Sequence, residues 1–447
     1  MPTVDELKQT AVAAIDQRKD EIVEIAKTVL ANPETGFTEQ KTARLVQEKF
    51  KSLGIPFRSN LAITGVKGVV EGGAGTGPSV SVIGELDSLR VLEHPYHDET
   101  TGAAHACGHH AQIGNMLGAM IGIMVPDVLK ALSGRIIPFA VPAEEFIEVE
   151  RRMLLRDEGK IEFMGGKQEL IQMGEFGDID MAMMCHTSSD RVPLTVGGTS
   201  NAHIVKYVEF IGRGSHAGGS PHLGINALNA AVFALSAVNA NRETFRDQDV
   251  VRVHGIITHG GEAVSAVPAN VTLEWRVRSG NLQALEMNSA KVDRSFKAGA
   301  MAVGAKVRIT NIPGYMPLRN DPIMQDVFKY NAIDLLGKAG LRVRNSGHNG
   351  GGSTDMGDLS QIIPVIHPYC GGATGTGHGK DYLVQDYNVS VVNPAKAMAM
   401  TVIDLLANGA EKAKEIVDKT ESPMTKDKYV NSQRNRAEVI EFDGAKA

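Results

Sequence analysis

Short apolar segments with strand character alternate with helical segments along most of the chain, and this alternation constrains the fold more than any other feature. Residues 79–84, 134–141 and 179–185 are apolar enough to be buried strands, and residues 112–124 have the length and apolarity of a buried helix. The alternation predicts an α/β fold with a largely parallel sheet. In such a sheet, functional side chains gather in the loops that follow the strands.

A different order of elements interrupts this alternation. The order there is strand, helix, strand, strand, helix, strand, with strands expected at residues 205–212, 250–258, 271–278 and 306–312 and helices at 226–242 and 284–303. This is the order of a ferredoxin-like α+β unit. Because the α/β pattern then resumes, we expect one domain made of residues 1–196 and 313–447 and an inserted domain at residues 197–312.

Two further segments carry specific structural expectations. Helical periodicity over residues 4–30 predicts one long helix that ends at Asn32-Pro33. The glycine-rich residues 72–77 look like a phosphate-binding loop, but a strand follows them and no Lys-Ser/Thr pair ends them. We therefore expect a hairpin turn and no nucleotide site at this position.

The charge and the apolar segments exclude several classes of partner. The 447 residues carry a net charge of −6 with one tryptophan and no basic stretch, so we expect no nucleic-acid binding. The longest apolar stretch, residues 113–125, is too short to cross a membrane, and the N-terminus lacks the pattern of a secretory signal. Three cysteines, a low and odd count, favour a reducing compartment. These features predict a cytoplasmic protein without a membrane partner.

A dense cluster of metal-ligating residue types precedes the apolar helix. Residues 105–110 read His-Ala-Cys-Gly-His-His. Cys107 and His109 lie two apart, so an extended backbone would point both side chains to the same side. Thiolate and imidazole bind zinc and other borderline divalent metals. A polar loop with a structural histidine is the alternative, but the density of the cluster favours a metal site.

Carboxylates follow two of the predicted strands. Glu144 and Glu145 follow the apolar strand at residues 134–141, after Pro142 and Ala143. At such a position one glutamate can bind a metal while the other takes a proton from metal-activated water. The segment Gly84-Glu85-Leu86-Asp87 likewise ends a strand and delivers carboxylates to a loop.

Two isolated histidines occupy comparable positions. His186 follows the apolar strand at residues 179–185, and His378 lies in the loop Gly375-Thr376-Gly377-His378-Gly379. An isolated histidine at the end of a strand is more often structural than a ligand. Both gain weight here because the other segments alone leave a two-metal site short of ligands.

Taken together and in this order, these segments resemble the aminoacylase-like metallohydrolase family. That family includes hippurate hydrolases, indole-acetyl-amino-acid hydrolases and p-aminobenzoyl-glutamate hydrolases, and it is related to carboxypeptidase G. The resemblance runs from Asn32-Pro33-Glu34-Thr35-Gly36-Phe37 to Gly377-His378. It implies a mostly parallel-sheet catalytic domain with an inserted lid and dimerisation domain, and hence a homodimer or a higher homo-oligomer. It also implies two divalent metal ions per subunit, with Mn²⁺ or Zn²⁺ favoured and Co²⁺ or Ni²⁺ compatible.

The resemblance assigns roles to individual residues of the catalytic domain. Cys107 corresponds to the ligand that bridges the two metals. Glu144 corresponds to the general acid/base, and Asp87 to the acid that supports a metal-binding histidine. The remaining protein ligands that the resemblance implies are His109, Glu145, His186 and His378.

In the inserted domain the resemblance implies contacts with the substrate. Gly212-Arg213-Gly214-Ser215-His216-Ala217 matches a lid loop whose histidine reaches an active site, often that of the partner subunit. His216 would then polarise the scissile carbonyl or stabilise its oxyanion. Arg278 matches an arginine near the substrate end, although a charged strand residue is an equally good interpretation. Ser265 stands where the family has an asparagine that helps to hold a substrate carboxylate.

Several positions depart from the family pattern. The usual metal loop is His-Ala-Cys-Gly-His-Asp followed by a further histidine, whereas His110 and Gln112 occupy these two positions here. Residues 146–175, with three arginines, are atypical of aminoacylases. Gly351-Gly352-Ser353-Thr354-Asp355 resembles the p-aminobenzoyl-glutamate branch more than the hippurate branch. These departures spare the metal chemistry and leave the substrate open.

The predicted function is metal-dependent hydrolysis of a small-molecule substrate. The bond is the C–N amide bond of an N-acyl or N-aroyl amino acid, or of a similar small amide, and the nucleophile is water activated by two metals. Two alternatives stay open: hydrolytic deamination of an aromatic amine by the same metals, and a metal-binding protein without catalytic activity. The Glu144-Glu145 pair argues against the second alternative, because a binding protein needs no general base.

Overall fold

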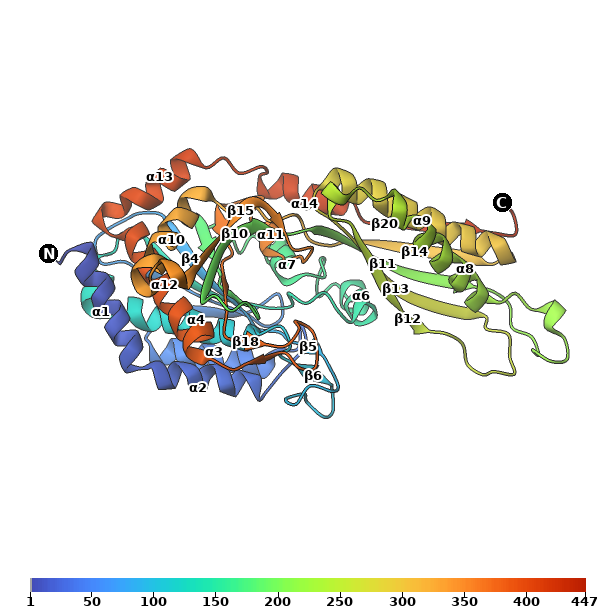
Figure 1. Cartoon of the computed structure of the whole chain (residues 1–447), viewed down its shortest axis with the longest axis horizontal. Coiled ribbons are helices and arrows are strands. Elements are labelled where there is room, and N and C mark those ends of the chain that lie inside the picture. The colour runs from blue at the N-terminus through green and yellow to red at the C-terminus, as the bar shows by residue number, and fades with distance from the viewer. Residues whose placement is uncertain (1) are drawn as a thin grey trace. The chain divides into compact units, whose positions relative to one another are not determined.

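The computed structural model describes residues 2–447, which form two compact units (Figure 1). The first unit contains the residues up to Thr199 together with Arg319–His348 and Asp358–Lys426. The second unit contains Ser200–Leu318, Asn349–Gly357 and Asp427–Ala447. The second unit is therefore built mainly from a segment inserted into the first.

A seven-stranded mixed sheet forms the centre of the first unit. Its strands follow the order β1-β2-β7-β4-β8-β16, and β3 pairs with β7 along the same edge as β2. The four strands from β7 to β16 run parallel, whereas β1, β2 and β3 pair antiparallel. The α/β architecture expected from the sequence is confirmed. The strands are β1 (Phe57–Leu61), β2 (Gly65–Gly68), β3 (Val70–Glu71), β4 (Ser79–Glu85), β7 (Arg135–Val141), β8 (Met181–Met183) and β16 (Val365–Ile366).

Smaller sheets and ten further helices complete the first unit. One sheet has the order β15-β10-β17-β9, and two others pair β18 with β19 and β5 with β6. These strands are β5 (Leu89–Arg90), β6 (Ala103–Ala104), β9 (His186–Thr187), β10 (Leu194–Thr199), β15 (Leu341–Asn349), β17 (Tyr369–Cys370), β18 (Ala373–Thr374) and β19 (Leu383–Val384). The helices besides α4 are α1 (Val4–Gln17), α2 (Lys19–Leu30), α3 (Gln40–Ser52), α5 (Pro126–Ala131), α6 (Val149–Asp157), α7 (Gly166–Met173), α10 (Pro322–Leu336), α11 (Met356–Leu359, of which the last two residues belong to this unit), α12 (Asn393–Leu406) and α13 (Glu411–Lys419).

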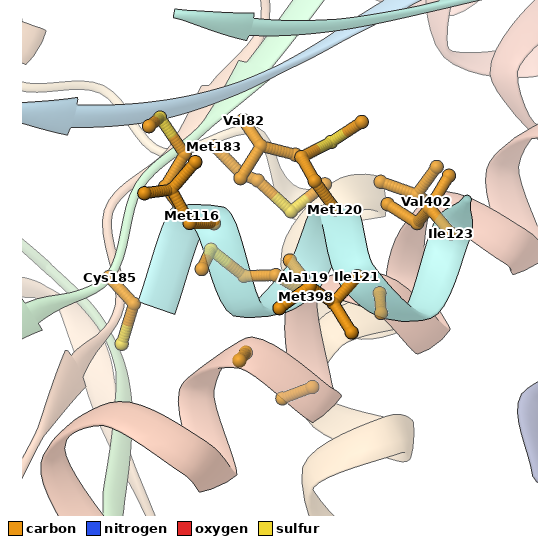
Figure 2. Close-up of a cluster of buried hydrophobic side chains, with 14 of the residues drawn as sticks. Val82, Met116, Ala119, Met120, Ile121, Ile123, Met183, Cys185, Met398 and Val402 are labelled. Carbon is orange, nitrogen blue, oxygen red and sulfur yellow. The ribbon is translucent and has the colours of Figure 1, made fainter. Parts of the chain in front are cut away.

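Helix α4 (His109–Ile123) is buried along its whole length. It packs against β4 and β8 and against α1, α2 and α12, and Figure 2 shows its side chains in one apolar cluster with those of β4, β8 and α12. Glycines 114, 118 and 122 lie one turn apart and allow this close packing, since a Cβ at Gly118 would lie 2.9 Å from the Cβ of Ala395. The packing fixes the N-terminus of α4, where His109 lies.

Two local expectations differ from the structure. The helix expected at residues 4–30 is interrupted at Arg18, whose φ of −110° and ψ of 16° separate α1 from α2. Neither glycine nor proline marks this break in the sequence. Residues 72–77 do not form a hairpin, because β3 and β4 lie on opposite sides of β7 and the loop crosses the end of that strand. The amide of Gly72 donates to the carbonyl of Gly134 there.

A five-stranded antiparallel sheet with the order β12-β13-β11-β14-β20 forms the second unit, and α8 and α9 pack on it. The first six elements follow the expected strand-helix-strand-strand-helix-strand order. They are β11 (Ala202–Ile211), α8 (Ala227–Ala240), β12 (Arg252–His259), β13 (Asn270–Ser279), α9 (Leu282–Val303) and β14 (Lys306–Pro313).

The C-terminal residues lie in the second unit and not with residues 313–426, where the sequence placed them. After α14 (Lys426–Arg434), strand β20 (Glu438–Asp443) pairs antiparallel with β14. Ile440 and Phe442 pack against the apolar core of the second unit, which gives the physical reason for this assignment. The strand is short and its apolar pattern is weak, so the sequence alone did not reveal it.

One stretch, Asn388–Leu406, has the length and apolarity to cross a membrane by composition alone. Most of it, 78%, is buried inside the protein, as in the core helix of a folded domain. The sequence pointed instead to residues 113–125 as the longest apolar stretch.

Candidate metal centre

The five ligands predicted from the sequence come together in the first unit. Ligand atoms of Cys107, His109 and His186 all lie within 4.8 Å of one another, and so do those of Cys107, Glu145 and His378. Cys107 belongs to both groups. This is the arrangement expected of a thiolate that bridges two metal ions, with two further protein ligands for each ion.

The hydrogen-bond partners of two histidines set which ring nitrogen is free. Nδ1 of His109 lies 2.9 Å from the carbonyl oxygen of Asp87, and Nδ1 of His186 lies 2.7 Å from the carbonyl oxygen of Thr187. A carbonyl only accepts, so each Nδ1 carries the proton and donates it. Each Nε2 then offers a lone pair, and Nε2 of His186 lies 3.3 Å from Sγ of Cys107. Both rings are held in the tautomer that binds metal through Nε2.

Buried polar atoms without hydrogen-bond partners test whether these residues fit a metal. Nε2 of His109 and Oε1 of Glu145 are both buried and lack such a partner. An unsatisfied buried polar atom costs roughly 1–3 kcal/mol, so such atoms call for an explanation. Both are ligand atoms of the two groups, and a divalent ion in each group would satisfy them. The donor set of sulfur, nitrogen and carboxylate oxygen fits zinc and related divalent metals.

The electrostatic surroundings of Cys107 and Glu145 also fit a metal site. Burial and the neighbouring Glu145 raise the pKa of the Cys107 thiol well above its ordinary value. Burial opposes ionisation of Glu145 as well, but His378 and His109 lower its pKa below that of an ordinary glutamate. A metal-bound cysteine is a thiolate, so metal binding at Cys107 has to release a proton.

The two remaining acidic residues predicted for the catalytic domain flank His109. Oδ1 of Asp87 lies 3.3 Å from Nδ1 of His109, and its Oδ2 accepts a hydrogen bond of 2.9 Å from the amide of Glu145. Oε2 of Glu144 lies 3.8 Å from Nε2 of His109, on the metal-facing side of the ring. Asp87 therefore contacts both the ring of His109 and the backbone of Glu145, and Glu144 faces the Nε2 side of that ring.

The sequence did not single out Glu85, which lies closer to His109 than Glu144 does. Its Oε2 is 3.1 Å from Nε2 of His109, and its side chain is fully buried. Lys167 donates to Oε1 at 2.6 Å, and Gln112 donates to Oε2 at 2.9 Å. Burial alone would raise the pKa of Glu85, but Lys167 and His109 lower it below the ordinary value. The acidic segment Gly84–Asp87 was the only sequence signal for this residue.

Residues 146–175, atypical in sequence, brace the glutamate turn. The buried guanidinium of Arg152 donates to the carbonyl of Glu145 and, at 2.6 Å, to that of Met164. Its charge also lies over the ring of Phe37, 5.3 Å from the centroid. Part of this segment therefore holds the backbone that carries Glu144 and Glu145.

A second buried acid supports the same turn. Glu39 accepts hydrogen bonds from the amide of Ala143 at 2.8 Å and from the hydroxyl of Thr64 at 2.6 Å. Ala143 has a φ of +53°, a strained value for a residue other than glycine. Burial and the neighbouring Asp87 raise the pKa of Glu39 to about 7.

Hydrogen bonds also tie three of the ligand loops to one another. The amide of His378 donates to the carbonyl of Ala106 at 2.8 Å. The hydroxyl of Thr187 donates to the carbonyl of Cys107 at 3.0 Å and lies 2.6 Å from the hydroxyl of Tyr382. The three loops therefore hold their ligands in a fixed relation before any metal binds.

The lid residues predicted from the sequence all lie in the second unit. His216 is exposed, and its loop runs beside that of Ser265, whose carbonyl accepts from the amide of Ala217 at 2.8 Å. Arg278 lies at the other end of β13, where it donates to the hydroxyl of Ser353 at 2.8 Å. The His216 loop follows Ile211, which pairs with Asn270, eight residues from Arg278. Eight strand residues span about 26 Å, so His216 and Arg278 are far apart within one chain.

The surroundings of Arg278 are basic. Its Nε donates to Nε2 of His254 at 3.3 Å, and burial together with Arg278 and Arg276 lowers the pKa of His254 to about 4. His254 is therefore neutral at physiological pH and can accept this hydrogen bond. The arginine charges make this end of β13 suited to an anionic group.

Relatives with known names share most of the chain. Residues 198–301 match the family described as the peptidase dimerisation domain. The chain is 27% identical over 414 residues to the Xaa-Arg dipeptidase of Mus musculus, which covers 90% of this chain and 89% of that protein. It is 23% identical to the IAA-amino acid hydrolase ILR1-like 6 of Arabidopsis thaliana, over 82% of this chain and 76% of that protein.

The fold also matches a solved structure. A dinuclear metal binding peptidase from the M20 family of Bacillus subtilis superposes with a TM-score of 0.62 at 17% identity, over 87% of this chain and 98% of the other. That protein is described as binding a dinuclear metal centre, and this chain brings together two ligand groups that share Cys107. The dimerisation-domain match, the named relatives and this structure together show that the chain is similar over most of its length to peptidases and amidohydrolases of the M20 family.

Proposed function

We propose that this protein hydrolyses the C–N amide bond of an N-acyl or N-aroyl amino acid, or of a similar small amide, with two divalent metal ions per subunit. The observation that carries the proposal is the pair of ligand groups that share Cys107, with Glu144 beside them. A metal-binding protein without activity would need the ligands but not the second buried glutamate.

The relatives support the choice of substrate class. One is named a dipeptidase and the other a hydrolase of an amino-acid conjugate, so both names describe cleavage next to an amino acid. The arginines around Arg278 and the hydroxyl of Ser353 offer partners for the carboxylate of such a substrate.

The chain's own residues divide the work between holding the ions and moving a proton. Two divalent ions supply, when bound, an activated water and polarisation of the amide carbonyl. Asp87 and the carbonyl of Thr187 keep His109 and His186 in the tautomer with a free Nε2. Glu144 takes a proton from the water. It then donates this proton to the amide nitrogen, because the nitrogen must be protonated in order to leave as an amine.

The lid residues of one chain serve two different active sites in this proposal. Strand β13 spans about 26 Å from Asn270, which pairs with the residue before the His216 loop, to Arg278, too far for His216 and Arg278 to contact one small substrate together. The dimerisation domain supports a homodimer in which His216 stabilises the oxyanion in the partner's site. Arg278, far from that histidine on the same sheet, is left to bind the carboxylate of a different substrate molecule.

Replacing Glu144 by Gln tests the reaction. The Glu144→Gln variant should lose a factor of about 10²–10⁴ in kcat while its metal content, measured by mass spectrometry, stays near that of the wild type. Glu148→Gln is the matched control, because it makes the same substitution nearby in the chain. Glu148 is partly exposed and pairs with Arg151 on α6. Full activity of the Glu144→Gln variant would refute the proposed proton transfer.

A substrate panel tests the bond. The zinc- and manganese-loaded protein should cleave some member of a panel of N-acyl amino acids, aminobenzoyl-glutamate and dipeptides that end in arginine. Release of ammonia from simple aryl amines, with no cleavage of any amide, would favour the deaminase instead.

A further inference from the structure

The close approach of Glu85 to His109 is not a hydrogen bond. Nδ1 of His109 carries the ring proton, because it faces the carbonyl of Asp87. Nε2 lies 3.1 Å from Oε2 of Glu85, yet Nε2 has no hydrogen-bond partner. Two fully buried atoms that can each bind a metal therefore lie in contact without a hydrogen bond between them.

The spacing of the two atoms is that of two ligands on one ion. Ligand atoms at about 2.0–2.1 Å from a tetrahedral ion lie about 3.3 Å apart. The corresponding spacings inside the two ligand groups are 3.3 Å between Sγ of Cys107 and Nε2 of His186 and 3.5 Å between Oε1 of Glu145 and Nε2 of His378. The 3.1 Å between Glu85 and His109 belongs to the same range, and Glu85 forms a third possible ligand group with His109 and Glu144.

Lys167 and Gln112 hold the carboxylate of Glu85 in place. Lys167 donates to Oε1, whereas Gln112 donates to Oε2 and leaves that oxygen a second lone pair. Hydrogen bonds of this kind orient ligating carboxylates in metal sites. A fully buried Lys-Glu pair contributes little to stability, because desolvation offsets the attraction, so stability alone does not explain it. Gln112 and the segment that carries Lys167 are both departures from the family pattern, and both contact this one carboxylate.

We infer that Glu85 is a protein ligand of the ion bound by Cys107, His109 and His186, and that Lys167 and Gln112 are the residues that position it. This inference rests on the proposed two-metal function. The ion then has four protein ligands of sulfur, nitrogen, nitrogen and oxygen type, whereas the ion bound by Cys107, Glu145 and His378 has three. The ion with three protein ligands would leave more room for water and substrate, as metal ions in catalytic sites do.

Metal affinity separates a ligand from a nearby charge. Glu85→Gln and Glu144→Gln remove the same charge at 3.1 Å and 3.8 Å from the same nitrogen, so the second variant is a matched control for the first. Co²⁺ is titrated into the metal-free full-length variants against a competing chelator, and the visible absorption of each bound ion is recorded. We expect two ions for the wild type and for Glu144→Gln. For Glu85→Gln we expect one ion at wild-type affinity and a loss of at least about 100-fold for the other, with a changed spectrum.

The outcomes distinguish failure of the inference from failure of the proposed function. Two ions bound by Glu85→Gln with wild-type affinity and spectrum, or equal losses in Glu85→Gln and Glu144→Gln, would overturn the role of Glu85 alone. A wild-type protein that binds no ion or one ion would overturn the two-metal proposal itself. Because Glu85→Gln removes the carboxylate that faces the buried Lys167, the double variant Glu85→Gln/Lys167→Met is measured as well. It removes both charges and should show the same loss of one ion.

Discussion

The two units of this protein hold their functional residues in opposite ways. In the first unit, Cys107, His109 and Glu145 are enclosed by partners that fix their orientation, and loops from distant parts of the sequence are tied to one another. In the second unit, His216 is exposed, and Arg278 lies at the far end of the same sheet. Under the proposed function, the first unit supplies the chemistry, whereas the second unit contacts the substrate and the partner chain.

Among the variants that test this comparison, loss of the lid histidine His216 should lower activity the most. We expect His216→Ala to lower kcat about 10²–10³-fold without changing metal content, because it removes a partner of the developing oxyanion. Heterodimers purified with two different tags, one chain His216→Ala and the other Glu144→Gln, should recover about half of the wild-type activity. In such a dimer one site combines an intact Glu144 with the partner's intact histidine. Inactive heterodimers would show that His216 serves its own chain, and the division of labour across β13 would be wrong.

Asp87 and Arg278 offer a paired test of the same comparison. Asp87→Asn should weaken metal binding about 10–100-fold, because its carboxylate orients His109 and the amide of Glu145. Arg278→Met should leave metal affinity unchanged and raise KM. Chelator competition and steady-state kinetics on both variants measure these effects. A loss of metal from Arg278→Met would contradict the separation of roles between the units.

The smallest effect concerns the stability of the first unit. The pKa of Glu39 is about 7 in the folded protein and close to 4.5 when unfolded. Its folded pKa is raised, so its contribution is fully present below about pH 4.5 and is lost as the pH rises through 7. Glu39→Gln imitates the protonated form, so its stability relative to the wild type should rise by roughly 3 kcal/mol between pH 4.5 and 8. Urea denaturation of both proteins across this range measures the difference, and parallel curves would argue against a protonated Glu39.

The same contrast explains what could be predicted from the sequence. The candidate ligands were identifiable because Cys107 and His109 form a dense cluster of ligand types, Glu145 comes after the buried strand β7, and His186 comes soon after the buried strand β8. Glu85, Glu39 and Lys167 were not singled out, because a carboxylate at a strand end does not reveal which buried partner it meets. The C-terminal strand β20 was missed because its pairing with β14 depends on a tertiary contact across the chain. Residue type and local position therefore predicted which side chains come together, and the residues that support them required the structure.

The bridging role of Cys107 is the central claim, and X-ray absorption spectroscopy of the zinc-loaded protein tests it most directly. The account predicts about two zinc ions per chain, a sulfur neighbour at about 2.3 Å and a second zinc at about 3.5–4 Å. The sulfur neighbour should disappear in Cys107→Ser, since Cys185 and Cys370 lie outside both ligand groups. A zinc spectrum without sulfur or without a second zinc in the wild type would contradict the shared thiolate and the two-metal site built on it.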